Sequence, residues 1–269
     1  MPTVEEIIGV IGEIAPPGWA EEWDNPGLQV GSLKAEVEKI LLSLDPTFDS
    51  LNDAVEKKAQ MLFTHHPLIF KPVARIDRDV FPGDIIERAL RNGITIFSAH
   101  TNLDVAEGGI NDILASLFEL EDVEVLEPLH HEAGKKLGLG RVGNLRQERT
   151  LLEMVEKVKE VLGTERVESV GHMDSRIGRV AVVGGAGGTM IPAASEKEAD
   201  LLITGDLSYH NGQEALRRGL AVLDAGHFYT EKAPFSRFSI PLKKAFRDRG
   251  LEVSLEICHR ERDPATRCL

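Results

Sequence analysis

Short apolar runs that alternate with helix-like segments constrain the fold of this chain most strongly. In the first part of the sequence, residues 40–44, 61–64 and 94–98 are apolar runs of strand length. Apolar residues at helical spacing lie between them, over 51–59 and 85–90. A strand–helix–strand–helix order is typical of an α/β sheet in which many strands are parallel.

The same alternation of apolar runs and helix-like segments returns in the second part of the sequence, after a stretch of different composition around residues 124–140. That stretch has no apolar periodicity and contains Pro128, His130-His131 and Gly134-Lys135-Lys136, so we place a domain boundary there. A helix is then expected over 151–162, with strands over 180–183, 199–204 and 220–223. A last helix leads to a strand over 251–257, and residues 261–269 are expected to form a frayed tail.

Polar side chains that can bind metals follow four of the predicted strands. In open α/β sheets, ligands bind beyond the carboxyl ends of the strands. The side chains concerned are His65 and His66, His100 with Asp104, Asp206 with His210, and His227 with Glu231.

The adjacent His65 and His66 leave two interpretations open. Successive side chains on a strand point to opposite sides, so the two rings are not expected to face the same way. Such a pair suits two neighbouring ions, with one ring nitrogen for each. The alternative is a hydrogen-bonded histidine pair in a loop.

The spacing of the other candidates also suits metal binding. His227 and Glu231 are four residues apart, and on a helical turn both side chains lie on one face. Asp206 and His210 have the same spacing. Imidazole and carboxylate ligands without thiolates favour Zn²⁺, Fe²⁺, Mn²⁺ or Co²⁺. Two such ions, about 3.5–4 Å apart, are well bridged by carboxylates and lower the pKa of bound water.

Two further segments carry alternative interpretations, and a third is expected to begin a helix. Asp24 is either a ligand or a member of an Asp-Asn-Pro-Gly turn. The glycine-rich segment 184–188 either cradles a phosphate or forms a tight turn, and it matches neither common phosphate-binding pattern. Asp45 and Pro46 are expected to begin a helix, with Asp45 as its cap.

Composition narrows the classes of function. The net charge is −13, with no basic run, which argues against a nucleic-acid backbone as partner. The two cysteines, Cys258 and Cys268, form no CxxC motif, which fits a reducing compartment. We find no secretory signal and no apolar stretch long enough to span a membrane, so the expected location is the cytoplasm.

Several motifs in one order resemble the Nif3-like family, often labelled GTP cyclohydrolase 1 type 2. They are Trp23-Asp24-Asn25-Pro26-Gly27-Leu28, Thr64-His65-His66-Pro67, Ala99-His100-Thr101-Asn102-Leu103-Asp104, Thr204-Gly205-Asp206 with Tyr209-His210, and Gly226-His227 with Glu231. The resemblance covers nearly the whole chain.

The resemblance implies a fold, a site and an assembly. The fold is a Nif3-like α/β fold with two facing lobes and a dinuclear metal site between them. The first lobe comprises residues 1–124, completed by 232–269, and the second comprises 125–231. The implied metal ligands are His65, His66, Asp104, His227 and Glu231. His100 and His210 would lie nearby and handle substrate or protons. The family commonly forms a toroidal homohexamer.

The implied activity is hydrolysis of a nucleotide such as GTP, or of a related small molecule, by water activated on two divalent metal ions. Under the family label, the imidazole ring of guanine opens and formate leaves, although the same site chemistry suits phosphoester or amide hydrolysis. The alternative is a non-catalytic metal-binding scaffold or metal-delivery protein, which would exchange its ions readily and turn over no substrate. A third interpretation, a nucleic-acid clamp, conflicts with the negative charge.

Overall fold

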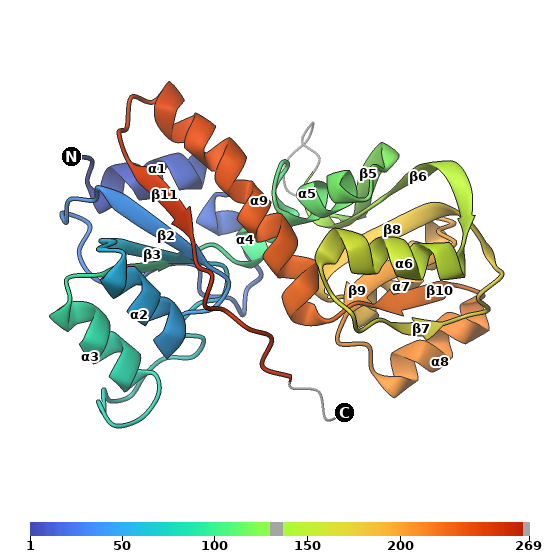
Figure 1. The fold of residues 1–269 in the computed structure, drawn as a ribbon, viewed down its shortest axis with the longest axis horizontal. Coiled ribbons are helices and arrows are strands. Elements are labelled where there is room, and N and C mark those ends of the chain that lie inside the picture. The colour runs from blue at the N-terminus through green and yellow to red at the C-terminus, as the bar shows by residue number, and fades with distance from the viewer. Residues whose placement is uncertain (130–136, 266–269) are drawn as a thin grey trace. The chain divides into compact units, whose positions relative to one another are not determined.

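The computed structural model describes residues 1–129 and 137–265, and the chain divides into two compact units. The first unit comprises Met1–Leu103 and Phe235–Leu269, and the second comprises Asp104–Pro234. Each unit contains its own sheet (Figure 1). Residues 104–124, which the sequence-based bounds place in the first lobe, pack and pair within the second unit.

The first sheet has the strand order β1-β4-β3-β2-β11. Strand β1 is antiparallel to β4, and the other neighbours are parallel, as the alternation of apolar runs predicts. The strands are β1 (Gly27–Val30), β2 (Lys39–Ser43), β3 (Met61–Thr64), β4 (Thr95–Ser98) and β11 (Ser254–Ile257).

Helices cover both faces of this sheet. Leu41, Leu62 and Ile96, on adjacent strands, pack with apolar residues of α2 (Phe48–Glu56) and α3 (Gly83–Arg91). Phe63 lies on the opposite face, because side chains alternate along a strand. There its ring centroid is 5.5 Å from that of Phe235, so the returning part of α9 (His227–Asp248) closes the first core.

The second sheet has the order β5-β6-β8-β9-β10-β7. Its centre, β8 with β9 and β9 with β10, is parallel, and its outer pairs are antiparallel. The strands are β5 (Glu121–Pro128), β6 (Gly138–Thr150), β7 (Glu168–Val170), β8 (Arg176–Ala186), β9 (Leu201–Gly205) and β10 (Ala221–Asp224).

Helices also cover both faces of the second sheet. One apolar cluster joins Val180, Val182 and Ile203 to α5 (Ile110–Leu117) and α6 (Leu151–Leu162). The alternating residues Ala181 and Leu202 pack on the other face, against α7 (Ile191–Glu196) and α8 (Tyr209–Arg218). The sheet is therefore buried on both sides, which explains the continuous apolar runs in its central strands.

The remaining helices are short or terminal. They are α1 (Val4–Ile14), which begins at a capping box formed by Thr3 and Glu6, α4 (Thr101–Val105), and two 3₁₀ turns, Pro17–Trp19 and Gly188–Met190. Both α4 and α9 run across a division between the units.

Two sequence-based expectations for the first unit are wrong. Helix α2 begins at Phe48 with Thr47 as its cap, because the Thr47 hydroxyl accepts the Ser50 amide and leaves Asp45 outside the helix. The tail is not frayed at Glu261, whose carboxylate accepts hydrogen bonds from the end of β2.

The prediction of a loop over 124–140 is wrong at both ends, because residues 124–128 belong to β5 and 138–140 belong to β6. Pro128 ends β5 and Gly138 begins β6, and the two strands are antiparallel. Residues 130–136 lie outside the described residues, as does Cys268. Over the part of the chain that the structure describes, no helix combines the length and apolarity that a membrane crossing needs.

Candidate metal centre

Three histidines gather at the carboxyl end of the first sheet. His65 and His66 follow β3, and His100 follows β4. The chain bends directly after Thr64, so the alternation of a strand no longer applies and the prediction that the two rings face apart is wrong. The ring centroids of His65 and His66 are 5.1 Å apart. One ligand nitrogen from each of the three histidines lies within 4.8 Å of the other two.

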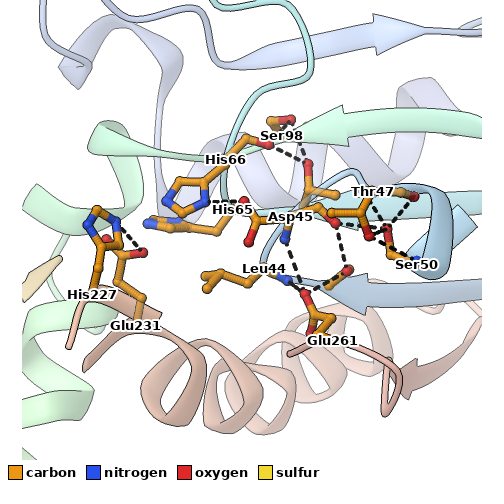
Figure 2. Close-up of polar contacts among 12 residues, drawn as sticks. Leu44, Asp45, Thr47, Ser50, His65, His66, Ser98, His227, Glu231 and Glu261 are labelled. Atoms are coloured by element: carbon orange, nitrogen blue, oxygen red, sulfur yellow. Dashed lines mark hydrogen bonds and ion pairs between the residues drawn. The ribbon is translucent and has the colours of Figure 1, made fainter. Parts of the chain in front are cut away.

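Each of these rings is held through its Nδ1 atom by an oxygen that can only accept a hydrogen bond. His65 Nδ1 lies 2.9 Å from the Ala99 carbonyl oxygen. His66 Nδ1 lies 2.7 Å from the Asp45 carboxylate (Figure 2), and His100 Nδ1 lies 2.8 Å from that of Asp24. Nδ1 therefore carries the proton, and in the neutral ring Nε2 carries the lone pair. Histidines that bind metals are usually fixed in this way.

Asp24 both stabilises the turn that contains it and orients His100. Its carboxylate accepts the Asn25 amide at 2.7 Å, as expected for the turn. It also accepts the Thr101 amide at 3.1 Å and the Thr101 hydroxyl at 2.5 Å. Burial by itself would raise the pKa of Asp24, but the hydrogen bonds from His100 and Thr101 outweigh it and lower the pKa to about 2. An ionised Asp24 thus orients His100.

The second unit repeats this arrangement with His227 and Glu231. His227 follows β10 and begins α9, and its Nδ1 donates to the Asp206 carboxylate at 2.7 Å. Its Nε2 lies 3.1 Å from Oε2 of Glu231, one helical turn later (Figure 2). A neutral ring and a carboxylate would direct lone pairs toward the same point, as two ligands of one cation do. The predicted sharing of one helix face by these two residues is confirmed.

The glycine-rich segment shapes the surroundings of Glu231. The amides of Gly184, Gly185 and Gly187 donate to side-chain oxygens of Asn111, Thr230 and Thr204. These donors are therefore already used within the unit, which favours the tight turn over the phosphate cradle. A Cβ atom on Gly185 would lie 2.2 Å from Oε1 of Glu231. Glycine is needed here for Glu231 to approach the backbone.

Two predicted site residues make other contacts. Asp104 lies on α4, and its backbone carbonyl oxygen accepts a hydrogen bond from the side-chain amide of Asn111 at 3.0 Å. His210 is exposed on α8, and its ring meets the Tyr209 ring edge-on at 5.5 Å between centroids. Among the described residues, neither Asp104 nor His210 belongs to a group of three or more possible ligands. Their assignments stay predictions.

Sequence reasoning named Asp24, Asp45 and Asp206 but missed their role as the carboxylates that orient the histidines. Asp45 follows β2 and orients His66, which follows the neighbouring β3. In the same way, Asp206 follows β9 and orients His227, which follows the neighbouring β10. An available signal was that adjacent parallel strands bring their carboxyl ends together.

The residues present fit a divalent cation. The possible donors are three imidazole nitrogens in the first unit, and an imidazole nitrogen with a carboxylate oxygen in the second, which suits Zn²⁺, Fe²⁺, Mn²⁺ or Co²⁺. The oriented Nδ1 atoms supply the outer hydrogen bonds that such ligands require.

Comparison with known proteins gives one consistent family. The model of the Duf34/NIF3 family (NGG1p interacting factor 3) matches residues 2–264. A Clostridium acetobutylicum protein named GTP cyclohydrolase 1 type 2 homolog is 35% identical over 97% of each chain. A Clostridium perfringens protein of the same name is 37% identical over 85% of this chain and 86% of its own. The crystal structure of a Bacillus cereus protein related to NIF3 superimposes with a TM-score of 0.91 at 27% identity over 99% of each chain.

Proposed function

The chain belongs to the Duf34/NIF3 family, and we propose that it is a metal-dependent hydrolase of a small molecule, with a nucleotide such as GTP as the first candidate. The proposed ligands of two divalent ions are His65, His66, Asp104, His227 and Glu231. The relatives named GTP cyclohydrolase 1 type 2 homolog support the choice of substrate. The observation that carries the proposal is the shared orientation of the histidines, in which acceptor oxygens hold Nδ1.

The chain's own residues would bind the ions and handle protons. When bound, a divalent cation supplies Lewis-acid polarisation and lowers the pKa of water. Asp45 and Asp206 keep the rings of His66 and His227 in the tautomer that presents Nε2. His100, oriented by Asp24, is the proposed proton carrier beside the ligands, with His210 as the second candidate.

A hollow beside His66 can receive a small molecule. It has a volume of about 340 Å³, within the usual range for ligand sites, and its lining includes Asp45, Phe48, His66, Phe81 and Asp84. The Phe48 and Phe81 side chains are exposed and offer flat apolar surfaces. A hollow of this size supports a small molecule as the substrate.

The test combines metal analysis of purified protein with a panel of nucleotides and other phosphoesters and amides. We expect the wild type to retain divalent metal and to hydrolyse at least one compound, and His65→Ala to lose metal and turnover together. His172→Ala, at an exposed histidine outside the site, is the matched control. Full activity in a metal-free His65→Ala/Glu231→Ala protein would contradict the proposal. Rapid ion exchange without turnover would instead support the metal-delivery scaffold.

A further inference from the structure

The segment after β11 is tied to the end of β2. The Cys258 amide donates to the Leu42 carbonyl at 2.7 Å, which extends the pairing of the two strands by one step. The Arg260 guanidinium then pairs with Glu56 of α2. Glu261 follows, and its carboxylate reaches the residues that come directly after β2 (Figure 2).

A single oxygen of Glu261 accepts from three donors at this turn. Oε1 lies 2.7 Å from the Ser43 hydroxyl and 3.1 Å from the Asp45 amide, and it also accepts the Leu44 amide. The Leu44 and Asp45 amides lie past the last residue of β2, and the Glu261 carboxylate accepts their hydrogen bonds. Hydrogen bonds to an ionised acceptor are stronger than neutral ones, so this contact fixes the backbone at Leu44 and Asp45.

Asp45 is held on its other side as well. Its carbonyl oxygen accepts the Ser50 hydroxyl at 2.8 Å. With both its amide and its carbonyl fixed, the direction of the Asp45 Cα–Cβ bond is set, and its carboxylate meets Nδ1 of His66 at 2.7 Å. The Asp45 side chain is 41% exposed, so little packing around it would hold this direction by itself.

We propose that Glu261 is a positioning residue for the metal site: through the backbone of Leu44 and Asp45 it aims the Asp45 carboxylate at His66, so that His66 presents Nε2 as the ligand atom. This rests on the proposed function in so far as His66 is a metal ligand. Glu261 touches neither His66 nor substrate in this scheme, and it acts only through Asp45.

The first measurement needs no metal. Long-range ¹H–¹⁵N spectra of the metal-free protein report the tautomer of each histidine ring. In the wild type, His65 and His66 should both carry the proton on Nδ1. In Glu261→Ala, the His66 ring should shift toward a mixture of tautomers, while His65, held by the Ala99 carbonyl, should keep its signals.

The second measurement is titration with Mn²⁺ or Zn²⁺. Loss of an outer hydrogen bond to a ligand typically weakens metal affinity about 10–100-fold, and we expect a loss in this range for Glu261→Ala. Glu261→Gln keeps one acceptor oxygen for the amides and should recover most of the affinity. Arg260→Ala is the matched control, because it loosens the same segment at Glu56 without removing the carboxylate.

Three outcomes separate the possible failures. Unchanged His66 signals in Glu261→Ala would overturn the inference. An equal change of the His66 signals in Arg260→Ala would also overturn it, because it would show that any loosening of the segment after β11 has the same effect. If the wild type binds no divalent metal, the proposed function is wrong. The tautomer measurement would still test the role of Glu261, because it needs no metal. If Glu261→Ala does not fold, Glu261→Asp, which draws the carboxylate back by one methylene, should give the same selective change at His66.

Discussion

At the scale of single residues, strand register decides which carboxylate orients which histidine. His65, His66, His100 and His227 stand out because each follows an apolar run. Their partners depend on strand register, which the sequence does not specify. Ser43 lies opposite Thr64 in the pairing of β2 with β3, so Asp45 and His66 come two residues later on each strand. A shift of register by one residue would separate them.

Asp206→Asn tests the orientation of His227. Asp206 has a φ of 53°, a left-handed conformation that asparagine tolerates, so the change removes charge with little backbone strain. We expect metal affinity to fall about 10–100-fold, because the ring loses the carboxylate that supports its basicity. Calorimetric titration measures the effect, and Asp174→Asn at an exposed position is the control. Unchanged affinity would show that Asp206 does not support a ligand.

At the scale of elements, the glycine-rich turn after the apolar part of β8 leaves room for a carboxylate on α9. The sequence left a phosphate cradle and a tight turn open, because glycine composition alone does not show where the amides point. Gly185 has a φ of 68°, and its missing Cβ lets Glu231 approach.

Gly185→Ala should weaken metal binding strongly and lower stability by about 1–2 kcal/mol. The strain arises from the left-handed backbone, and the loss of affinity arises because the new methyl group displaces Glu231. Gly219→Ala is a close control, since Gly219 has a φ of 70° with no atom within 4 Å of the added Cβ. Urea unfolding and metal titration should show similar strain in both variants but weaker binding only in Gly185→Ala. Equal metal affinity in the two variants would contradict this account of Glu231.

A buried carboxylate on α2 makes the stability of the first unit depend on pH. Asp53 is 7% exposed and pairs with Lys57 at 3.2 Å. Burial would raise the pKa of Asp53, but hydrogen bonds from Lys57 and Cys258 outweigh it, so the pKa lies below its ordinary value. A lowered folded pKa stabilises the protein above the unfolded pKa of about 3.9, and this contribution is lost as the pH falls through the folded pKa.

We therefore expect Asp53→Asn to cost about 1–3 kcal/mol near neutral pH. The difference from wild type should shrink as the pH falls below about 3.9. Urea unfolding at several pH values measures it, with Asp79→Asn at an exposed position as the control. A difference that stays constant down to acid pH would show that the ionised form of Asp53 is not what stabilises the fold.

At the scale of the whole molecule, the alternation of apolar runs and helical segments predicted two α/β units, and the Nif3-like fold is confirmed. The antiparallel outer strands of the second sheet were not predicted, because β5 and β7 carry few buried side chains that would mark them as strands. The tethered tail was also missed, since Glu261 lies in a polar segment and its partners are more than two hundred residues away. The toroidal homohexamer stays a prediction that sedimentation velocity can test.

The central proposal is a dinuclear metal centre with His65, His66, Asp104, His227 and Glu231 as its ligands. Electron paramagnetic resonance of the protein loaded with two equivalents of Mn²⁺ per chain tests it most directly. Two Mn²⁺ ions about 3.5–4 Å apart should be exchange-coupled and give a multiline spectrum. His65→Ala and Glu231→Ala should each abolish that coupling. A simple six-line spectrum of isolated ions in the wild type would contradict the claim.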